Sequence, residues 1–277
     1  MQIRRKIKTA VRTLLREGPV AFLRACRNYM AVTYGSYRPS ESEIAFDVLD
    51  TDPVQGLMID VGAHHGRALA PFARSGWQVF AFEPDSRNRA SLLKSFGDCR
   101  NVVVDARALS DHRQEKAVLY RSEESTGISG LSCFHSSHRP AEEVEVTTLE
   151  SFLDERGMAD EDVTFLKIDT EGFDLHVLRG FPWHLSSPRL ILCEFEDAKT
   201  VPLGYRFHDV CAFLQGHGYK LVVSEWYPIK RYGDPHKWRR FATYPCQLQD
   251  SNSWGNILAA GDREIYEKLL RACNLKD

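Results

Sequence analysis

The sequence predicts an α/β domain built around a mostly parallel β-sheet. Apolar runs of strand length recur along the 277 residues, and helix-compatible segments separate most of them. Repeated alternation of apolar strands with helices indicates a parallel sheet that helices cover on both faces. No Pro-, Gly- or Ser-rich linker divides the chain, and its length suffices for one large domain. We therefore expect a single domain with appendages.

The expected elements follow one another in a regular order. The strand candidates are 57–61, 77–82, 101–105, 116–120, 144–147, 163–168, 189–194, 219–223 and 256–260. The helix candidates are 67–74, 85–96, 149–156, 173–179 and 206–217, preceded by a segment at 44–49 whose Ser-Glu-Ser-Glu start has the pattern of a capping box. The pieces 116–120 and 144–147 resemble a hairpin and break the alternation. We interpret about 112–148 as an insertion between the third and fourth core strands.

The stretch from Leu57 to Gly66 is typical of a nucleotide-binding turn. An apolar strand runs into Asp60 and then into a turn with glycine at Gly62 and Gly66, followed by helix-compatible sequence. Glycine lets the backbone turn sharply and approach a ligand, and the start of a helix offers unpaired N–H groups. An ordinary strand-to-helix turn would show the same pattern, so this stretch alone does not decide the function.

A second acid strengthens the nucleotide hypothesis. Glu83 and Pro84 end the next strand, 21 residues after Gly62. A carboxylate there can accept hydrogen bonds from both hydroxyls of a ribose. The glycine spacing, however, is not the G-x-G-x-x-G that admits the pyrophosphate of a nicotinamide cofactor, which makes an oxidoreductase the weaker alternative. A nucleoside without phosphates, such as S-adenosylmethionine, fits better.

Five ordered motifs resemble those of FkbM-type methyltransferases. They are DVGAHHG at 60–66, FEP at 82–84, ALSD at 108–111, VTTL at 146–149 and FLKIDTEGFD at 165–174, with a weaker similarity in SWGNILA at 253–259. The resemblance covers about residues 57–200 and departs from the family at His64, where the family usually has Asn. It implies a Rossmann-like class I methyltransferase domain with a seven-stranded sheet whose last strand is antiparallel. It also implies S-adenosyl-L-methionine as cofactor, bound by Asp60, Gly62, His64, Gly66, Glu83 and Ala108.

The candidate catalytic residues are acids and one histidine near the carboxyl ends of strands, where ligands gather in such sheets. Asp169 and Glu171 lead as the base that takes a proton from an acceptor hydroxyl, and His65 and Glu194 are further candidates. Caps and helix-dipole partners explain acids at such positions equally well. We expect Lys167 to pair with a neighbouring carboxylate. The acids form no recognisable metal motif, so we assign no metal.

The resemblance implies transfer of a methyl group to an acceptor oxygen, with a sugar hydroxyl in a surface glycan or its precursor as the expected acceptor. Trp226, Arg239 and Arg240, in an aromatic and basic loop at about 224–245, are the candidate acceptor-binding residues. Their rings and cations suggest an anionic sugar, although a surface loop anchored by its aromatic residues has the same composition. Two alternatives are a methyltransferase for small natural products and a non-enzymatic scaffold at a membrane or a glycosyltransferase.

The charge distribution separates the start of the chain from the rest. Residues 1–30 carry eight Lys or Arg and one acid, a net charge of +7 within a chain whose total is −2. We expect a basic amphipathic helical extension at 1–40 before the domain at 41–277. This helix either docks on a protein surface or contacts the inner face of a membrane, peripherally. The overall charge argues against nucleic acid as a partner. Seven scattered cysteines and the lack of an apolar segment of signal or transmembrane length indicate a cytoplasmic protein. The sequence predicts no particular oligomeric state.

Overall fold

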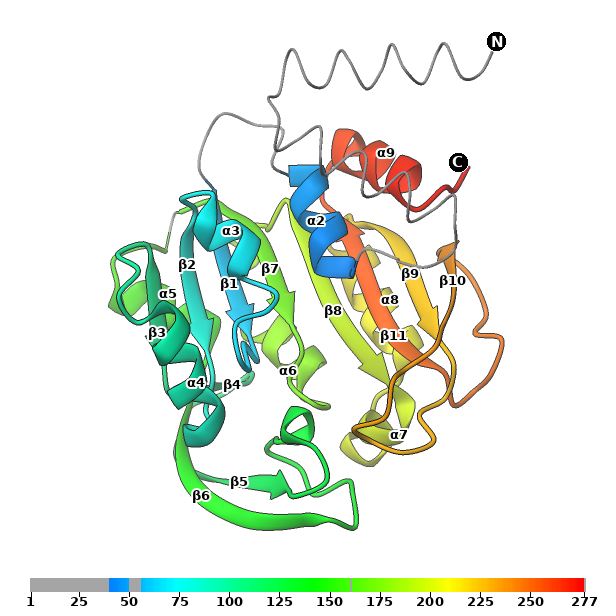
Figure 1. Cartoon of the computed structure of the whole chain (residues 1–277). Helices are drawn as coiled ribbons and strands as arrows, with labels where there is room; N and C mark the ends of the chain where they lie inside the picture. Colours follow the sequence, from blue (N-terminus) through cyan, green and yellow to red (C-terminus); the bar gives the residue numbers. More distant parts are fainter. Residues whose placement is uncertain (1–39, 50–55, 160, 277) are drawn as a thin grey trace. The chain divides into compact units, whose positions relative to one another are not determined.

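The computed structural model describes residues 40–49, 56–159 and 161–276 (Figure 1). The chain divides into two units, residues 1–43 and residues 44–277. The predicted capping box begins α2 (Glu41–Leu49): the Ser40 N–H donates to Glu43 Oε2 at 2.9 Å, and the Glu43 N–H donates to Ser40 Oγ at 3.3 Å. The predicted basic helix and its membrane contact fall on residues outside the described ranges, so they stay predictions.

The second unit is built on an eight-stranded sheet with the order β10-β9-β11-β8-β7-β1-β2-β3. Its strands are β1 (Leu57–Val61), β2 (Gln78–Phe82), β3 (Val102–Asp105), β7 (Val163–Ile168), β8 (Leu190–Glu196), β9 (Lys220–Trp226), β10 (Trp238–Thr243) and β11 (Trp254–Ala260). In the run β8-β7-β1-β2-β3, each strand is parallel to its neighbours. β11 lies between β8 and β9 and is antiparallel to both. The predicted core with an antiparallel last strand is confirmed.

The eighth strand, β10, corrects the prediction of a single loop at about 224–245. It pairs antiparallel with β9 and forms an edge of the sheet, so the loop is confined to residues 227–237. All six residues of β10 are half-buried rather than alternately buried and exposed. The period of two that identifies a strand in a sequence is therefore missing here.

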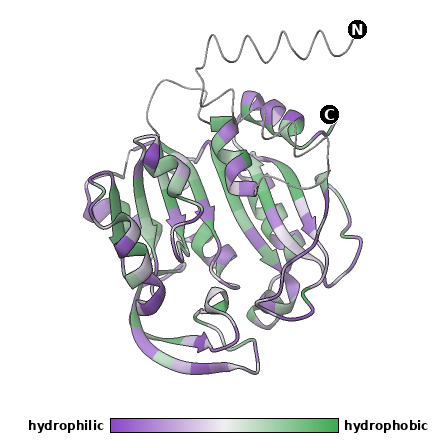
Figure 2. Cartoon of the chain, viewed as in Figure 1, coloured by the Kyte–Doolittle hydropathy of each residue, from purple (hydrophilic) through white to green (hydrophobic). Residues whose placement is uncertain are grey.

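Helices cover both faces of the sheet, as the apolar strands predicted. Buried side chains of α5 (Leu149–Glu155), α6 (Asp174–Arg179) and α8 (Phe207–Gly216) pack on one face. Those of α3 (Ala70–Arg74), α4 (Ser86–Phe96) and α9 (Arg263–Ala272) pack on the other. Figure 2 shows the strands as the most continuously hydrophobic part of the chain. Because both faces are covered, the sheet leaves its strand ends as the place for a ligand.

The predicted insertion forms a second, three-stranded sheet. β4 (Ala108–Leu109) pairs parallel with β6 (His138–Thr147), and β5 (Gln114–Ser122) pairs antiparallel with β6. Both hairpin strands extend beyond their predicted bounds, and the 3-10 helix η1 (Thr126–Ile128) lies between them. Figure 1 places this hairpin beyond the carboxyl ends of the central strands.

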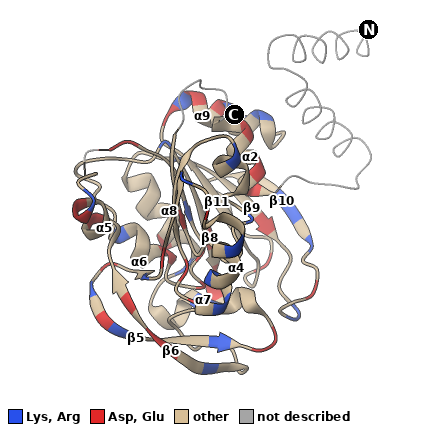
Figure 3. Cartoon of the chain, turned by 60° about the vertical axis from the view of Figure 1, so that its left-hand side comes forward, with Lys and Arg blue, Asp and Glu red and all other residues tan. Residues whose placement is uncertain are grey.

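Figure 3 shows Lys and Arg interspersed with Asp and Glu along the described helices and strands. On α9, for example, Arg263 pairs with Glu267 and Lys268 pairs with Glu264. Among the helices in the described ranges, none combines the length and the apolarity that crossing a membrane requires.

Candidate active site

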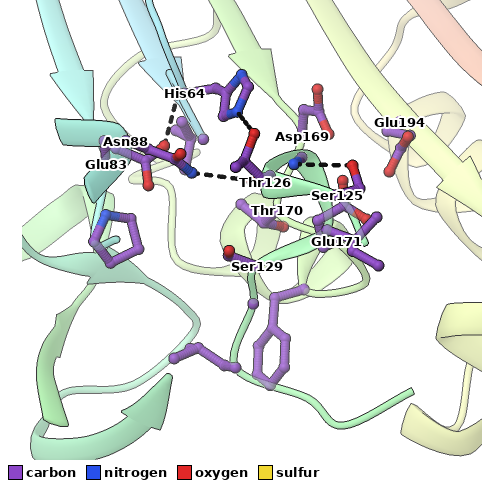
Figure 4. Close-up of a pocket in the computed structure, with 18 of the residues that line it drawn as sticks. His64, Glu83, Asn88, Ser125, Thr126, Ser129, Asp169, Thr170, Glu171 and Glu194 are labelled. Carbon is purple, nitrogen blue, oxygen red and sulfur yellow. Dashed lines mark hydrogen bonds between the residues drawn. The ribbon is translucent and has the colours of Figure 1, made fainter. Parts of the chain in front are cut away.

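A pocket of about 490 Å³ opens at the carboxyl ends of the central strands. Residues at or just after the ends of β1, β2, β7 and β8 line it, together with Trp254 at the start of β11. Residues 125–131 of the insertion and residues 229, 232, 233 and 236 of the loop after β9 complete the lining. In Figure 4, Glu83 and Glu194 lie at opposite ends of the pocket, with Asp169 and Glu171 between them. The pocket therefore spans the edge where parallel α/β sheets bind ligands.

Gly62 makes the turn after β1 possible. Its φ is 75°, and a Cβ at this position would lie 1.8 Å from the carbonyl oxygen of Asp169. The N–H groups of Gly62 and Ala63 both donate to the Phe82 carbonyl, at 3.0 and 2.9 Å. The turn is thus fixed between β2 and the end of β7, and Gly62 lines the pocket as predicted.

Gly66 has a different role from the predicted cofactor contact. Its φ is 79°, and a Cβ there would lie 2.5 Å from the ring of Phe96 and 2.7 Å from Leu92, both on α4. It lies outside the set of residues that line the pocket. Glycine at this position allows α4 to pack closely against the turn.

Glu83 ends β2 with its carboxylate held by the backbone. Its Oε2 accepts from the His64 N–H at 2.7 Å, and its Oε1 accepts from the Asp85 N–H at 2.9 Å. Burial raises the pKa of Glu83 to about 7, against these two hydrogen bonds, which lower it. Each oxygen keeps a further acceptor site, as a ribose with two hydroxyls requires.

The two histidines of the turn differ in their exposure and in their contact with the pocket. His64, with φ of 51°, lines the pocket, and its Nε2 lies 3.0 Å from Thr126 Oγ1 of the insertion. Burial and the neighbouring His65 lower the pKa of His64, so at neutral pH the ring is uncharged. His65 stacks on His64 with 3.7 Å between ring centroids and is exposed outside the pocket lining. The structure does not support His65 as a catalytic residue.

Asp60 lies beneath the pocket rather than in its wall. Its side chain is fully buried and contacts Lys167, with 3.1 Å from Oδ1 to Nζ. The Lys167 ammonium also donates to the Gly62 carbonyl at 2.7 Å and lies 3.5 Å from Asp169 Oδ2. Burial disfavours this charge, but the carboxylates of Asp60 and Asp169 raise the pKa of Lys167 overall. The predicted cofactor contact of Asp60 is therefore corrected to a support for the Gly62 turn and for Asp169.

The end of the pocket near Glu83 is largely apolar. Ala108, predicted to bind the cofactor, lines it together with Pro84, Leu109, Leu119 and Ile128. These side chains come from the turn after β2, from β4 and from the insertion, and they suit an adenine ring.

The opposite end of the pocket is acidic. Asp169, Glu171 and Glu194, all predicted, converge here, with one carboxylate oxygen of each within 4.8 Å of the others. Buried Lys199 on α7 (Asp197–Thr200) places its Nζ 2.6 Å from Glu171, 3.1 Å from Glu194 and 2.8 Å from Glu196. We call Lys199 and these three glutamates the Lys199 cluster. The sequence assigns no metal to these acids, and that assignment stays a prediction.

The candidate acceptor residues of the sequence lie elsewhere. Arg239 Nη1 is 3.2 Å and Arg240 Nε 2.7 Å from the carboxylate of Glu225, which is 1% exposed. Trp226 contacts Trp254, with 5.3 Å between ring centroids. Trp226, Arg239 and Arg240 are all outside the pocket lining, so the structure contradicts their predicted contact with an acceptor.

Four residues that line the pocket were missed as site residues. They are Lys199, Tyr232, His236 and Trp254. Trp254 lies in a stretch that resembles the family, and Tyr232 and His236 lie in the aromatic loop. The sequence singled out both segments, but other residues of the loop were chosen as site residues. Lys199 follows Glu194 and Glu196 by a few positions, and this spacing does not predict a buried ion pair.

A sequence comparison identifies the family to which the chain belongs. A model of the methyltransferase FkbM domain matches residues 60–221 of the chain. The chain belongs to this family. The predicted resemblance is confirmed, and this FkbM domain is an S-adenosylmethionine-dependent methyltransferase. No curated protein sequence matches the chain.

Solved structures similar to this FkbM domain include other methyltransferases. A precorrin-6y C5,15-methyltransferase from Geobacter metallireducens is 15% identical, with a TM-score of 0.38 over 79% of this chain and 87% of that one. Methyltransferase FkbM from Methylobacillus flagellatus is 15% identical, with a TM-score of 0.44 over 91% of this chain and 54% of that one. An rRNA methylase from Streptococcus thermophilus is 10% identical, with a TM-score of 0.40 over 80% and 94%.

The residues of the pocket fit S-adenosylmethionine. The Glu83 carboxylate suits the ribose hydroxyls, the apolar end suits adenine, and the turn at Gly62 and His64 suits the methionine end. The acidic end suits the positive charge of a sulfonium. The departure from the family at His64 keeps a neutral hydrogen-bonding side chain in the pocket.

Proposed function

We propose that the protein transfers the methyl group of S-adenosylmethionine to a hydroxyl, with a sugar of a surface glycan or its precursor as the acceptor. The observation that carries this proposal is the set of carboxyl groups at the end of the pocket opposite Glu83. An alcohol must lose its proton when it takes up a methyl group, and a carboxylate in contact with it can accept that proton.

The residues at the two ends of the pocket would have different roles. When bound, the cofactor supplies an activated methyl group, so the protein needs to align the acceptor and exclude water. Glu83 and the apolar end orient the nucleoside. Glu171 accepts the hydroxyl proton, while Asp169, held by Lys167, and Glu194 orient the acceptor.

The proposed acceptor is uncharged where it reacts. The expectation of an anionic sugar depended on Arg239 and Arg240, and both of these side chains pair with Glu225. The acceptor end instead presents Asp169, Glu171 and Glu194, which would repel a carboxylate or phosphate. The ring of Trp254 and its neighbour His236, 4.9 Å away, offer apolar faces on which a sugar ring can pack.

A methyl-transfer assay tests the proposal. The purified protein is incubated with methyl-labelled S-adenosylmethionine and a panel of neutral sugars, amino sugars, uronic acids and small alcohols, and products are located by mass spectrometry. We expect an O-methyl product from a neutral sugar. A methyl group found on carbon or nitrogen, or on uronic acids in preference, would contradict the proposal.

A variant of Glu83 tests the cofactor half separately. Glu83→Gln removes the negative charge that the ribose hydroxyls would contact, so we expect S-adenosylhomocysteine to bind at least about tenfold more weakly in a calorimetric titration. The wild type should also bind this ligand more tightly as the pH rises through about 7, where Glu83 ionises. Equal affinities in the two proteins would place the ribose elsewhere.

A further inference from the structure

The Lys199 cluster has fewer positive than negative charges. A single ammonium, 2% exposed, faces the carboxyl groups of Glu171, Glu194 and Glu196, and Asp169 adds another on the pocket side. Buried carboxylates repel one another strongly unless a cation or a proton compensates for them. The geometry therefore leaves room for a second positive charge in the pocket or for a bound proton.

Glu171 is the glutamate of the cluster that lies closest to the Lys199 ammonium, at 2.6 Å. Its backbone has φ of 59°, and the side chain is buried yet lines the pocket. In the described residues, the charged and titratable groups around it come from each neighbouring element: Asp169 after β7, Asp174 of α6, Glu194 and Glu196 of β8, Lys199 of α7, and Tyr232 of the 227–237 loop. Burial raises the pKa of Glu171 to about 8, and the nearby Lys199 ammonium opposes this rise. Without a ligand, burial therefore favours the protonated form of this carboxyl group.

The strand order directs the positive charge of the cofactor toward Glu171. Glu83 follows β2, Gly62 follows β1, Glu171 follows β7, and these strands are neighbours in the sheet. Neighbouring strands lie about 4.8 Å apart. The sulfonium of S-adenosylmethionine is joined to its ribose through one carbon, so a ribose at Glu83 leaves the sulfonium on the side of Asp169 and Glu171.

We propose that the positive charge of the methyl donor ionises Glu171, so that the base becomes active only when the donor is bound. This inference rests on the proposed function, because it requires S-adenosylmethionine in this pocket. A sulfonium beside the cluster supplies the second positive charge and favours release of the proton. The product S-adenosylhomocysteine is a neutral thioether, so beside it the carboxyl group keeps its proton.

The charges balance through the reaction. The acceptor oxygen forms its bond to the methyl carbon, the carbon–sulfur bond breaks with its electron pair going to sulfur, and the hydroxyl proton passes to Glu171. The sulfonium charge and the Glu171 charge thus disappear together. The Lys199 cluster returns to the state that it has without the donor, and no charge is left uncompensated in the buried pocket.

Proton release on binding tests the proposal. Calorimetric titrations with S-adenosylmethionine and with S-adenosylhomocysteine at pH 7, each in phosphate and in Tris, report the protons exchanged through the difference in buffer ionisation enthalpy. We expect the methyl donor to release about one proton more than the thioether. Equivalently, the ratio of donor to thioether affinity should rise at least about tenfold from pH 6 to pH 8. Glu83 meets the same ribose in both ligands, so its titration cancels in this comparison.

Matched variants test whether Glu171 is the group that releases the proton. Glu171→Gln should abolish the difference between the two ligands, and its retained binding of the thioether would show that the variant is folded. Glu150→Gln, on the exposed face of α5, should leave the difference intact. Equal proton release with both ligands in the wild type would overturn the inference and leave the proposed function standing. A difference that survives Glu171→Gln and disappears in Glu194→Gln would overturn the assignment to Glu171. Failure of both ligands to bind would contradict the proposed function itself.

Discussion

Single residues in the turn after β1 show how closely the pocket is fitted to its backbone. Gly62 and Gly157 both have left-handed φ values, 75° and 65°. A Cβ on Gly62 would collide with the Asp169 carbonyl at 1.8 Å, whereas a Cβ on Gly157 would meet nothing within 4 Å. The two positions therefore separate the cost of the backbone conformation from the cost of the collision.

We expect Gly62→Ala to lower the free energy of unfolding by about 3 kcal/mol or more, and Gly157→Ala by about 1 kcal/mol. The difference arises because the end of β7 would have to move away from β1. Urea denaturation of the two variants measures it, and titration with S-adenosylhomocysteine shows whether the pocket survives. Equal losses of stability would mean that the turn relaxes without disturbing Asp169.

At the scale of residues, the sequence predicted which side chains follow the strands but not where each one points. Glu83, Asp169 and Glu171 reach the pocket because they follow the ends of β2 and β7, and Glu194 reaches it from within β8, near the end of that strand. Asp60 is still within β1, where its register partner is Lys167, so it turns toward that ammonium. A lysine inside a strand that is covered on both faces predicted a carboxylate partner, and this pairing is confirmed. The sequence does not show the strand register that places Asp60 opposite Lys167.

At the scale of elements, the edge strand β10 depends on a buried charge. Glu225 on β9 accepts from Arg239, Arg240, the Gln249 N–H and the Ser253 hydroxyl. These groups lower its pKa, although burial alone would raise it. In the sequence, aromatic residues and arginines at 224–245 have the composition of a ligand-binding loop. Both arginines have a structural role because they pair with Glu225. The sequence does not show that Glu225 is buried, whereas the fold does.

We expect Arg240→Ala to lower the free energy of unfolding by about 2 kcal/mol, because it leaves part of the Glu225 charge without a partner. The double variant Glu225→Gln with Arg240→Ala should lose less than the sum of the two single variants, since the two side chains act as a pair. The exposed Arg263→Ala, which breaks a surface pair, serves as the control and should change stability by less than about 0.5 kcal/mol. Additive losses in the cycle would contradict the pairing.

The insertion is a second element whose function the sequence left open. Its strands were predicted as a hairpin, but residues 125–131, rich in Ser and Gly, gave no sign that they form a wall of the pocket. Two long-range contacts hold them there: Thr126 Oγ1 with His64 Nε2, and the Thr126 carbonyl, which accepts from Asn88 Nδ2 at 3.0 Å. Contacts between elements so far apart in the chain depend on the sheet topology.

At the scale of the whole molecule, the pocket concentrates carboxyl groups that folding makes harder to ionise. Burial raises the pKa of Glu83 to about 7, of Glu171 to about 8 and of Asp174 to about 6. In contrast, partners hold the pKa values of Asp85 and Asp111 below their ordinary range, against the effect of burial. The first group outweighs the second near neutral pH, because the second group is fully ionised there in both folded and unfolded chains.

This imbalance predicts that the ligand-free protein becomes less stable as the pH rises from about 7 to about 9, a range in which His64, His138 and His236, whose pKa values folding lowers, are uncharged in both states. A carboxyl group whose pKa is raised by folding binds its proton more tightly in the folded state, so stability is full below the unfolded pKa and declines through the folded one. Each such group contributes up to about 1.4 kcal/mol per pH unit within its window. Below about pH 4 the sign reverses, because Asp85 and Asp111 must then be protonated on unfolding.

Urea denaturation at pH 7, 8 and 9 measures the slope, and Glu171→Gln should flatten it while the exposed Glu150→Gln does not. A stability that stays constant or rises over this range would mean that the buried carboxyl groups are ionised at neutral pH without a ligand, and that the positive charge they lack is supplied by the protein itself.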